Sequence, residues 1–175
     1  MTLADIAKAF VVIFVAAIVQ VSLLSTFRVA GGYPELLLIT IVAVSLLRGS
    51  VFGAVGGFFG GLLMDTATLE TLGLTSLLLT VGGYWIGRYG ETTGRDRTHA
   101  PYVSAAVVTV LYAVGALLLH VLLGDAVSGR LVLIDSLVPT IVFNLILTAP
   151  VYLLVRKLLG SADWRDRAQE VRLLG

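Results

Sequence analysis

Few side chains in this sequence could take part in chemistry, and most of them stand beside or within long apolar segments. The strongest candidates are Gln20, Glu35, Asp65 and Asn144. A carboxylate in a membrane is a candidate cation site, proton carrier or partner of a basic group. Gln20 and Asn144 also suit interhelical hydrogen bonds, and Asp65 could be solvated at the outer interface or cap the next turn. The functional and the structural interpretations both stay open.

Patterns typical of enzymes and metal sites are missing from the sequence. There is no cysteine, and His120 has no second histidine or cysteine at metal-ligand spacing. Phosphate-binding loops, nucleophile elbows and zinc-protease motifs are also missing. We therefore expect no catalytic residues, no metal, no cofactor and no enzyme activity. The net charge of +1 gives no reason to expect nucleic-acid binding.

The densest pattern is a glycine stripe between residues 53 and 65. Gly53, Gly57 and Gly61 repeat every four residues, and Gly56 and Gly60 form a second row beside them. Such rows let two helix backbones approach closely in a membrane. The stripe therefore predicts either packing inside the protein's own bundle or a docking face for a partner's transmembrane helix. Both interpretations predict that Gly57→Leu is disruptive.

The composition places these residues in a membrane protein. The chain of 175 residues is 58% hydrophobic and 13% charged, with a mean hydropathy of +0.99, which leaves too little polar surface for a soluble globule. Six apolar runs approach the length that crosses a bilayer. They cover residues 6–27, 34–48, 51–66, 72–89, 102–123 and 131–157. We expect an all-α transmembrane bundle over residues 1–160.

The second and third runs could instead form one long span, which would give five spans. That arrangement would bury Arg48 near the centre of the membrane, at a cost of at least ~3 kcal/mol. With six spans and both termini in the cytoplasm, every Lys and Arg except Arg28 and Arg130 faces inward. The sequence therefore favours six. The tail, residues 161–175, is expected in the cytoplasm, either along the inner membrane surface as an amphipathic helix or in solution.

Three sequence features together resemble the MreD family of bacterial rod-shape-determining membrane proteins. The first is Pro34-Glu35 before Leu36. The second is the glycine-rich stretch from Gly57 to Asp65, with Phe58, Gly61, Leu62 and Leu63 at the motif positions and Gly60 as an extra glycine. The third is Leu72-Gly73 shortly afterwards. The resemblance covers the first half of the chain well, whereas the last two spans agree in hydrophobicity and order.

The resemblance implies a non-enzymatic component of the cell-elongation machinery in the bacterial cytoplasmic membrane. Its implied partners are the bitopic protein MreC, the MreB filament, a RodA-type polymerase and the elongation transpeptidase. The implied mechanism is scaffolding of lateral peptidoglycan synthesis. The family is also thought to share a six-helix fold with the substrate-binding subunits of energy-coupling-factor vitamin transporters.

That second similarity supplies the rival function, a substrate-binding subunit for a small molecule. A transport subunit would need an outward-facing cavity with convergent polar groups, and the candidates are Asp65, Glu70, His120 and Asp135. Few polar residues fall well inside the spans, which favours the scaffold. A third possibility, a small lipid or ion transporter, needs an intramembrane charge pair that the sequence does not show.

Overall fold

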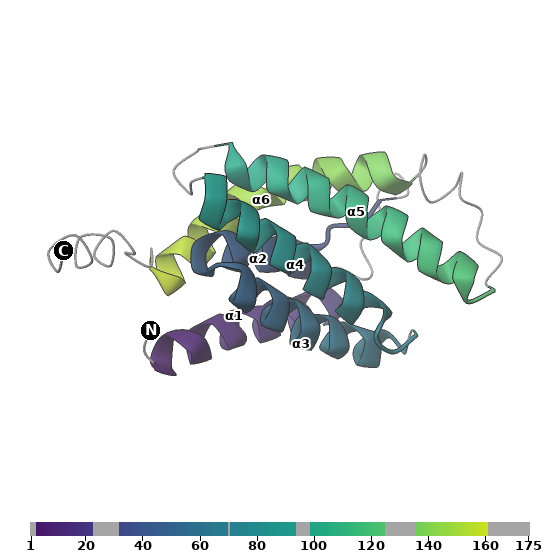
Figure 1. Cartoon of the computed structure of the whole chain (residues 1–175), viewed down its shortest axis with the longest axis horizontal. Helices are drawn as coiled ribbons and strands as arrows, with labels where there is room; N and C mark the ends of the chain where they lie inside the picture. The colour runs from purple at the N-terminus through teal and green to yellow at the C-terminus, as the bar shows by residue number, and fades with distance from the viewer. Residues whose placement is uncertain (1–2, 23–31, 70, 94–98, 125–135, 161–175) are drawn as a thin grey trace, which may run out of the picture.

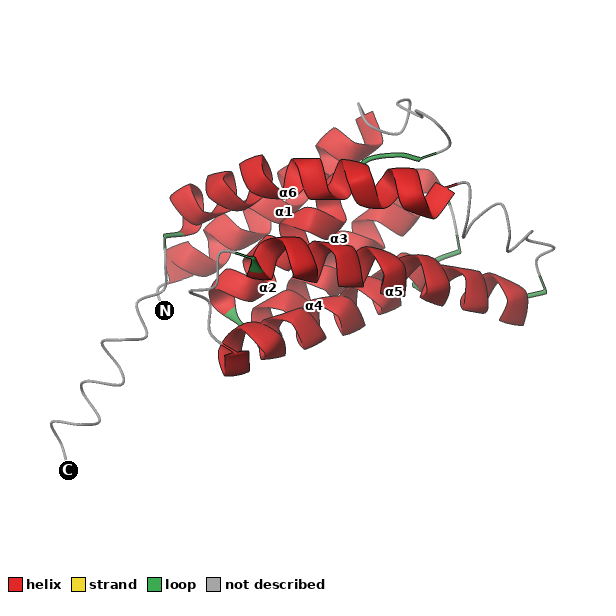
Figure 2. Ribbon diagram, turned by 90° about the horizontal axis from the view of Figure 1, so that it is seen from above, coloured by secondary structure: helices red, strands yellow, loops and turns green. Residues whose placement is uncertain are grey.

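The computed structural model describes residues 3–22, 32–69, 71–93, 99–124 and 136–160, and these residues form six helices. The helices are α1 (Leu3–Ser22), α2 (Leu36–Arg48), α3 (Ser50–Thr68), α4 (Leu74–Thr93), α5 (Ala100–Leu122) and α6 (Leu137–Leu159). In Figure 1, α1 and α3 lie on one side of the bundle and α5 and α6 on the other. Figure 2 shows the same helices and the loops between them from above. Over the described residues, the prediction of an all-helical fold is confirmed.

Membrane character is clearest in the longest helices. By length and composition, α3, α5 and α6 could each cross a membrane. Large apolar side chains are exposed along most of the bundle surface, for example Val11 at 60%, Trp85 at 63% and Leu118 at 59%. Such a surface needs lipid around it rather than water.

Helix α2 is the core of the bundle. It contacts all five other helices, and every residue from Leu37 to Arg48 is buried. A helix that is apolar on all sides suits a fully enclosed position. With 13 residues it is about 20 Å long, shorter than a hydrocarbon core of roughly 30 Å. Non-helical backbone at its ends therefore has to be satisfied by neighbouring side chains.

The junction between α2 and α3 settles the choice between one long helix and two. Gly49 separates the helices with φ 98° and ψ −178°, a conformation that is essentially restricted to glycine. The preceding residue, Arg48, is buried, and its guanidinium donates a hydrogen bond to the carbonyl oxygen of Leu159 at the end of α6. A cation at a helix C-terminus is favourable. The two-helix prediction is confirmed, and a single continuous helix is wrong.

The helix bounds differ from the predicted spans in detail. Helix α2 begins at Leu36, so Pro34 precedes the helix. Helix α4 continues four residues past the predicted boundary at Tyr89, to Thr93, because Glu91 in its last turn has partners on α3. The end of the first predicted span, the start of the last one, and the tail at 161–175 lie outside the described residues.

Candidate functional site

Asn144 of α6 is the centre of a buried polar cluster. Its side-chain oxygen accepts a hydrogen bond from the backbone N–H of Glu35, at 2.9 Å. Its amide nitrogen donates to the carboxylate of Glu35, at 3.0 Å, and to the hydroxyl of Thr109 on α5, at 2.9 Å. Asn144 is 0% exposed and Glu35 5%. The cluster joins α5 and α6 to the N-terminal end of α2.

Two further side chains bind the backbone that leads into α2. The carbonyl oxygen of the Gln20 side chain on α1 accepts from the N–H of Leu37, at 2.7 Å. The hydroxyl of Thr140 accepts from the N–H of Tyr33, at 3.4 Å. The first N–H groups of a helix have no acceptor within the helix, and in the hydrocarbon core no water is present to accept their hydrogen bonds. Gln20 and Asn144 therefore act as caps for the short central helix, and Thr140 holds the segment that precedes it.

Asp65 of α3 caps the N-terminus of the next helix, α4. It lies near the end of α3 and is 1% exposed. Its carboxylate accepts from the backbone N–H groups of Gly73 at 2.8 Å, Thr75 at 3.2 Å and Ser76 at 3.3 Å, at the start of α4. A carboxylate is stabilising there because a helix N-terminus presents unpaired N–H groups and a positive dipole end. The solvated position considered for Asp65 is wrong, and the capping position is the one observed.

Glu91 makes the reciprocal contact at the other end of the same helix pair. This residue of α4 accepts from the backbone N–H of Ser50 at 2.8 Å and from its hydroxyl at 3.0 Å, at the start of α3. It also pairs with Arg88, at 3.5 Å. Glu91 lies beyond the apolar part of α4, and these contacts lower its pKa, with the backbone N–H of Ser50 contributing most. Helices α3 and α4 thus cap each other through two carboxylates.

The first row of the glycine stripe faces α4 at backbone distance. A Cβ built on Gly53 would be 2.8 Å from the carbonyl carbon of Gly83, and one on Gly61 would be 2.8 Å from that of Thr75. Gly57 lies between them, and its added Cβ would be 2.8 Å from the backbone nitrogen of Thr80. The residue pairs run in opposite order along the two helices, so α3 and α4 are antiparallel. This row packs inside the bundle.

The second row faces α1. A Cβ on Gly56 would be 2.6 Å from the side-chain carbon Cδ1 of Ile13, and one on Gly60 would be 3.0 Å from its Cγ2. Ile13 therefore packs α1 against the second glycine row of α3. Both rows contact other helices of the same chain, and Gly60 also borders a surface groove.

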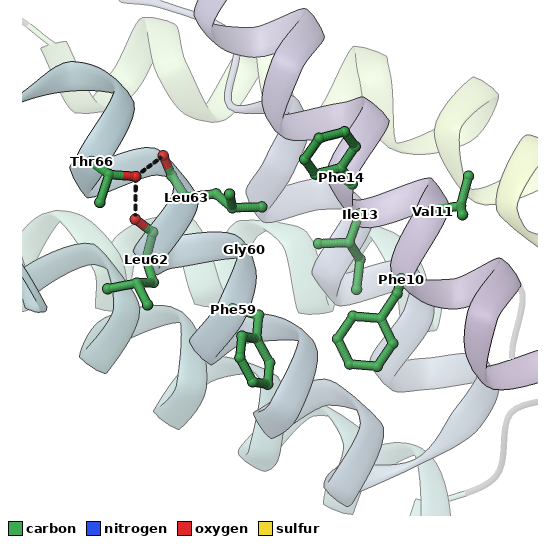
Figure 3. Close-up of a pocket in the computed structure, with 9 residues that line it drawn as sticks. All are labelled: Phe10, Val11, Ile13, Phe14, Phe59, Gly60, Leu62, Leu63 and Thr66. Carbon is green, nitrogen blue, oxygen red and sulfur yellow. Dashed lines mark hydrogen bonds between the residues drawn. The ribbon is translucent and has the colours of Figure 1, made fainter.

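That groove runs between α1 and α3 (Figure 3). It has a volume of about 710 Å³ and is lined by apolar side chains, a glycine and one threonine. The lining residues are Phe10, Val11, Ile13, Phe14, Phe59, Gly60, Leu62, Leu63 and Thr66. In Figure 3 the rings of Phe10 and Phe59 lie across the groove from each other, with centroids 5.8 Å apart. Such a groove suits an apolar occupant.

The structure brings some of the predicted residues together and separates others. Glu35 and Asn144 are in direct contact, whereas Asp65 lies at a different helix junction. Glu70 and Asp135, suggested for a transport cavity, lie outside the described residues. Sequence reasoning missed Thr109, Thr140 and Glu91. A threonine inside an apolar run was the available signal for the first two, and an acid directly after the aromatic end of a span was the signal for Glu91.

These features define the class of protein. Six helices form a bundle with an apolar exterior, and its buried polar groups bond to one another and to helix ends. This is the organisation of a multi-pass helical membrane protein. The chain belongs to the MreD family, because the family model of the rod shape-determining protein MreD matches residues 5–162. No curated protein and no solved structure matches it.

Membership of this family implies a role in rod-shape determination, in a family of non-enzymatic shape-determining proteins. The match extends over the whole of α5 and α6 as well, which the sequence resemblance covered only weakly. The expected likeness to vitamin-transporter subunits is not supported by a matching solved structure, and it stays a prediction.

Proposed function

We propose that this chain is a membrane scaffold of the bacterial cell-elongation complex that binds the bitopic protein MreC and supports lateral peptidoglycan synthesis. It crosses the cytoplasmic membrane six times with both termini in the cytoplasm. Through MreC it associates with the MreB filament, the RodA-type polymerase and the elongation transpeptidase. Family membership supports the role in rod shape, and the interior of the bundle supports a scaffold over a transporter.

The observation that carries the proposal is how the buried polar groups are used. The side-chain oxygen of Asn144, the side-chain carbonyl of Gln20 and both carboxylate oxygens of Asp65 accept hydrogen bonds from backbone N–H groups of neighbouring segments. A pocket for a polar vitamin needs convergent polar groups directed at a ligand. Here these groups hold helix ends together, so the described interior is built for rigidity.

Co-purification tests the proposal. Tagged MreC from the same bacterium is co-expressed with this chain, membranes are solubilised in mild detergent, and the tag is captured. We expect the chain to be recovered with MreC and to elute with it as one complex. Recovery of MreC alone contradicts the proposal. Recovery of this chain with ATPase subunits and a transport coupling protein would favour the vitamin-transport alternative.

A shape assay tests the cellular role. In a rod-shaped bacterium depleted of its own MreD, expression of this chain together with its cognate MreC should restore rods from spheres. Gly57→Leu, which places a bulky side chain against the backbone of α4, should fail to restore them. Restoration by a chain that does not co-purify with MreC would show that the role in shape does not depend on that contact.

A further inference from the structure

We infer that the end of the bundle at which α1 begins and α6 ends binds the headgroup of an anionic phospholipid of the inner leaflet, an inference that rests on the six-span orientation proposed above and does not involve MreC. Both views of the fold place the start of α1 and the end of α6 at the same end of the bundle (Figures 1 and 2). All five Lys and Arg side chains that the structure describes lie at this end, which we call the cationic end. They are Lys8, Arg48, Arg88, Arg156 and Lys157.

Contacts between helix ends place these cations. Arg48 ends α2, and its guanidinium donates to the carbonyl oxygen of Leu159, at the end of α6. Gln20 of α1 accepts a hydrogen bond from the N–H of Leu37, at the start of α2. Lys8 precedes Gln20 by twelve residues on the same helix, so it lies about 18 Å further along α1, toward the end of α2. The start of α1 and the end of α6 are therefore at the level of Arg48.

Two of the five cations already have partners in the protein. Arg48 binds the end of α6, and Arg88 pairs with an acid three residues later on α4, at 3.5 Å. The side chains of Lys8, Arg156 and Lys157 are exposed, and none of them makes a hydrogen bond or ion pair with another described residue. These three cations are the proposed contacts of the lipid headgroup.

The three acids whose side chains the structure describes do not neutralise these cations. Glu35 and Asp65 lie toward the opposite end, because α2 ends and α3 begins at the cationic end. Glu91 lies at the cationic end, but its carboxylate already binds Ser50 and Arg88. Among the described residues, the cationic end therefore carries an excess of positive charge, which is complementary to an anionic membrane surface.

The two free lysines each end an exposed apolar helix face. On α6, Lys157 follows the exposed Leu153 by four residues, and on α1, Lys8 precedes the exposed Val11 by three, so each lysine shares a helix face with an aliphatic side chain. Lys157 is also 20 residues from the start of α6, which is about 30 Å and equals the thickness of a hydrocarbon core. Lipid chains can therefore lie along these faces while the ammonium groups reach the headgroups.

Exposed aromatic side chains mark the same end as a membrane interface. Tyr84 and Trp85 lie one turn before Arg88 on α4 and make an edge-to-face pair with ring centroids 6.5 Å apart. Tyr102, near the start of α5, is exposed as well. Tyr and Trp are enriched at the level of the lipid headgroups. This position favours a lipid headgroup over a protein in the cytoplasm as the partner of the free cations.

Net charge decides which lipid is bound. Phosphatidylglycerol carries a phosphate with no balancing charge, whereas phosphatidylcholine carries an ammonium beside its phosphate and is neutral overall. Each Lys or Arg near an anionic membrane surface strengthens binding about fivefold, which corresponds to ~1 kcal/mol. Basic sites on the cytoplasmic side of helical membrane proteins bind anionic headgroups in this way.

Native mass spectrometry of the purified, delipidated full chain tests the inference, with phosphatidylglycerol and phosphatidylcholine as the two probes. We expect phosphatidylglycerol to bind more tightly. Lys8→Gln and Lys157→Gln should each weaken its binding about fivefold, whereas Lys157→Arg, which keeps the charge, should bind it as the unaltered chain does. Arg88→Gln is the matched control and should also leave binding unchanged, because it removes one charge that is already paired with Glu91. Size exclusion and circular dichroism check that each variant is folded.

Several outcomes overturn the inference. Equal binding of the two lipids does so, as do glutamine variants of both lysines that bind phosphatidylglycerol as tightly as the unaltered chain. An equal loss of binding in Arg88→Gln shows that total charge, and not the free cations, determines binding. Unchanged lipid binding together with loss of co-purified MreB from the lysine variants assigns the cations to that filament protein. Failure of MreC to co-purify, by contrast, removes the scaffold and leaves this inference standing.

Labelling of single cysteines tests the choice of leaflet, since the chain has no cysteine of its own. Ala7→Cys is next to Lys8 at the cationic end, and Leu69→Cys, at a position that is 92% exposed, follows α3 at the opposite end. In sealed spheroplasts a membrane-impermeant maleimide should label Leu69→Cys, and it should label Ala7→Cys only after the membrane is opened. The reverse pattern contradicts binding in the inner leaflet.

Discussion

Replacing Gly57 with alanine tests the closest helix contact in the protein. In the folded structure the new methyl group would lie 2.8 Å from the backbone nitrogen of Thr80 and nearer still to the carbonyl group of Leu79. Both are backbone atoms of α4, so no side chain can rotate away to make room. The helices have to separate locally, and they are held at each end by the carboxylates of Asp65 and Glu91.

Two opposing terms set the size of the effect. Overpacking a well-filled interior typically costs 1 to 3 kcal/mol and sometimes more, and an obstacle made of backbone belongs at the upper end. Alanine has a better helix propensity than glycine by about 1 kcal/mol, which acts in the other direction. We therefore expect Gly57→Ala to lower the free energy of unfolding by about 2 kcal/mol.

Unfolding by SDS in mixed detergent micelles, followed by helical circular dichroism, measures this difference. Gly82→Ala on α4 is the matched control, because its added methyl group would be 3.3 Å from a side-chain carbon of Val108 and at no backbone atom. It makes the same change in helix propensity without meeting backbone, so its effect should lie between neutral and a stabilisation of about 1 kcal/mol. If Gly57→Ala proved as stable as Gly82→Ala, the backbone-to-backbone contact of α3 and α4 would be refuted.

Three further changes test the caps and the turn, with the same unfolding assay. Asn144→Leu keeps the side-chain size but removes its hydrogen bonds to Glu35 and Thr109, and should cost about 2 kcal/mol, while an unchanged stability would contradict the cluster. Asp65→Asn should cost less than Asp65→Ala, and only the alanine variant should greatly speed hydrogen exchange at the start of α4; equal exchange in both would contradict capping. Gly49→Ala should cost about 1 to 3 kcal/mol because of its positive φ, and neutrality would show that the turn can adopt another conformation.

The number and order of helices could be predicted from the sequence because lipid imposes a simple length rule. Apolar runs near 20 residues mark helices, and the cost of burying Arg48 in mid-membrane separated the second run from the third. The stripe from Gly53 to Gly61 predicted close helix contacts for the same kind of reason, since glycines every four residues share a helix face.

Which helix occupies the centre could not be predicted. In a soluble protein an apolar face points inward, but in a membrane lipid and protein neighbours are equally apolar, so hydropathy does not separate them. Helix α2 and the exposed part of α5 have similar compositions, yet Leu37 to Leu47 are enclosed, whereas Val103, Leu111 and Leu118 of α5 are exposed. The hydrogen-bond partners of the polar groups could not be predicted either, because residues such as Asn144 and Glu35 are 109 positions apart in the chain.

The contacts of α3 differ between its neighbours α1 and α4. Helices α3 and α4 are locked by backbone contacts along their length and by a carboxylate at each end. Helix α1 packs against α3 through Ile13 and Phe10, and Gln20 near the end of α1 accepts a hydrogen bond from α2. Helix α1 therefore meets α3 through side chains, whereas α4 meets α3 at backbone distance. Enlarging a residue should be tolerated better where α1 meets α3 than where α4 does, because a side chain can rotate away and a backbone atom cannot.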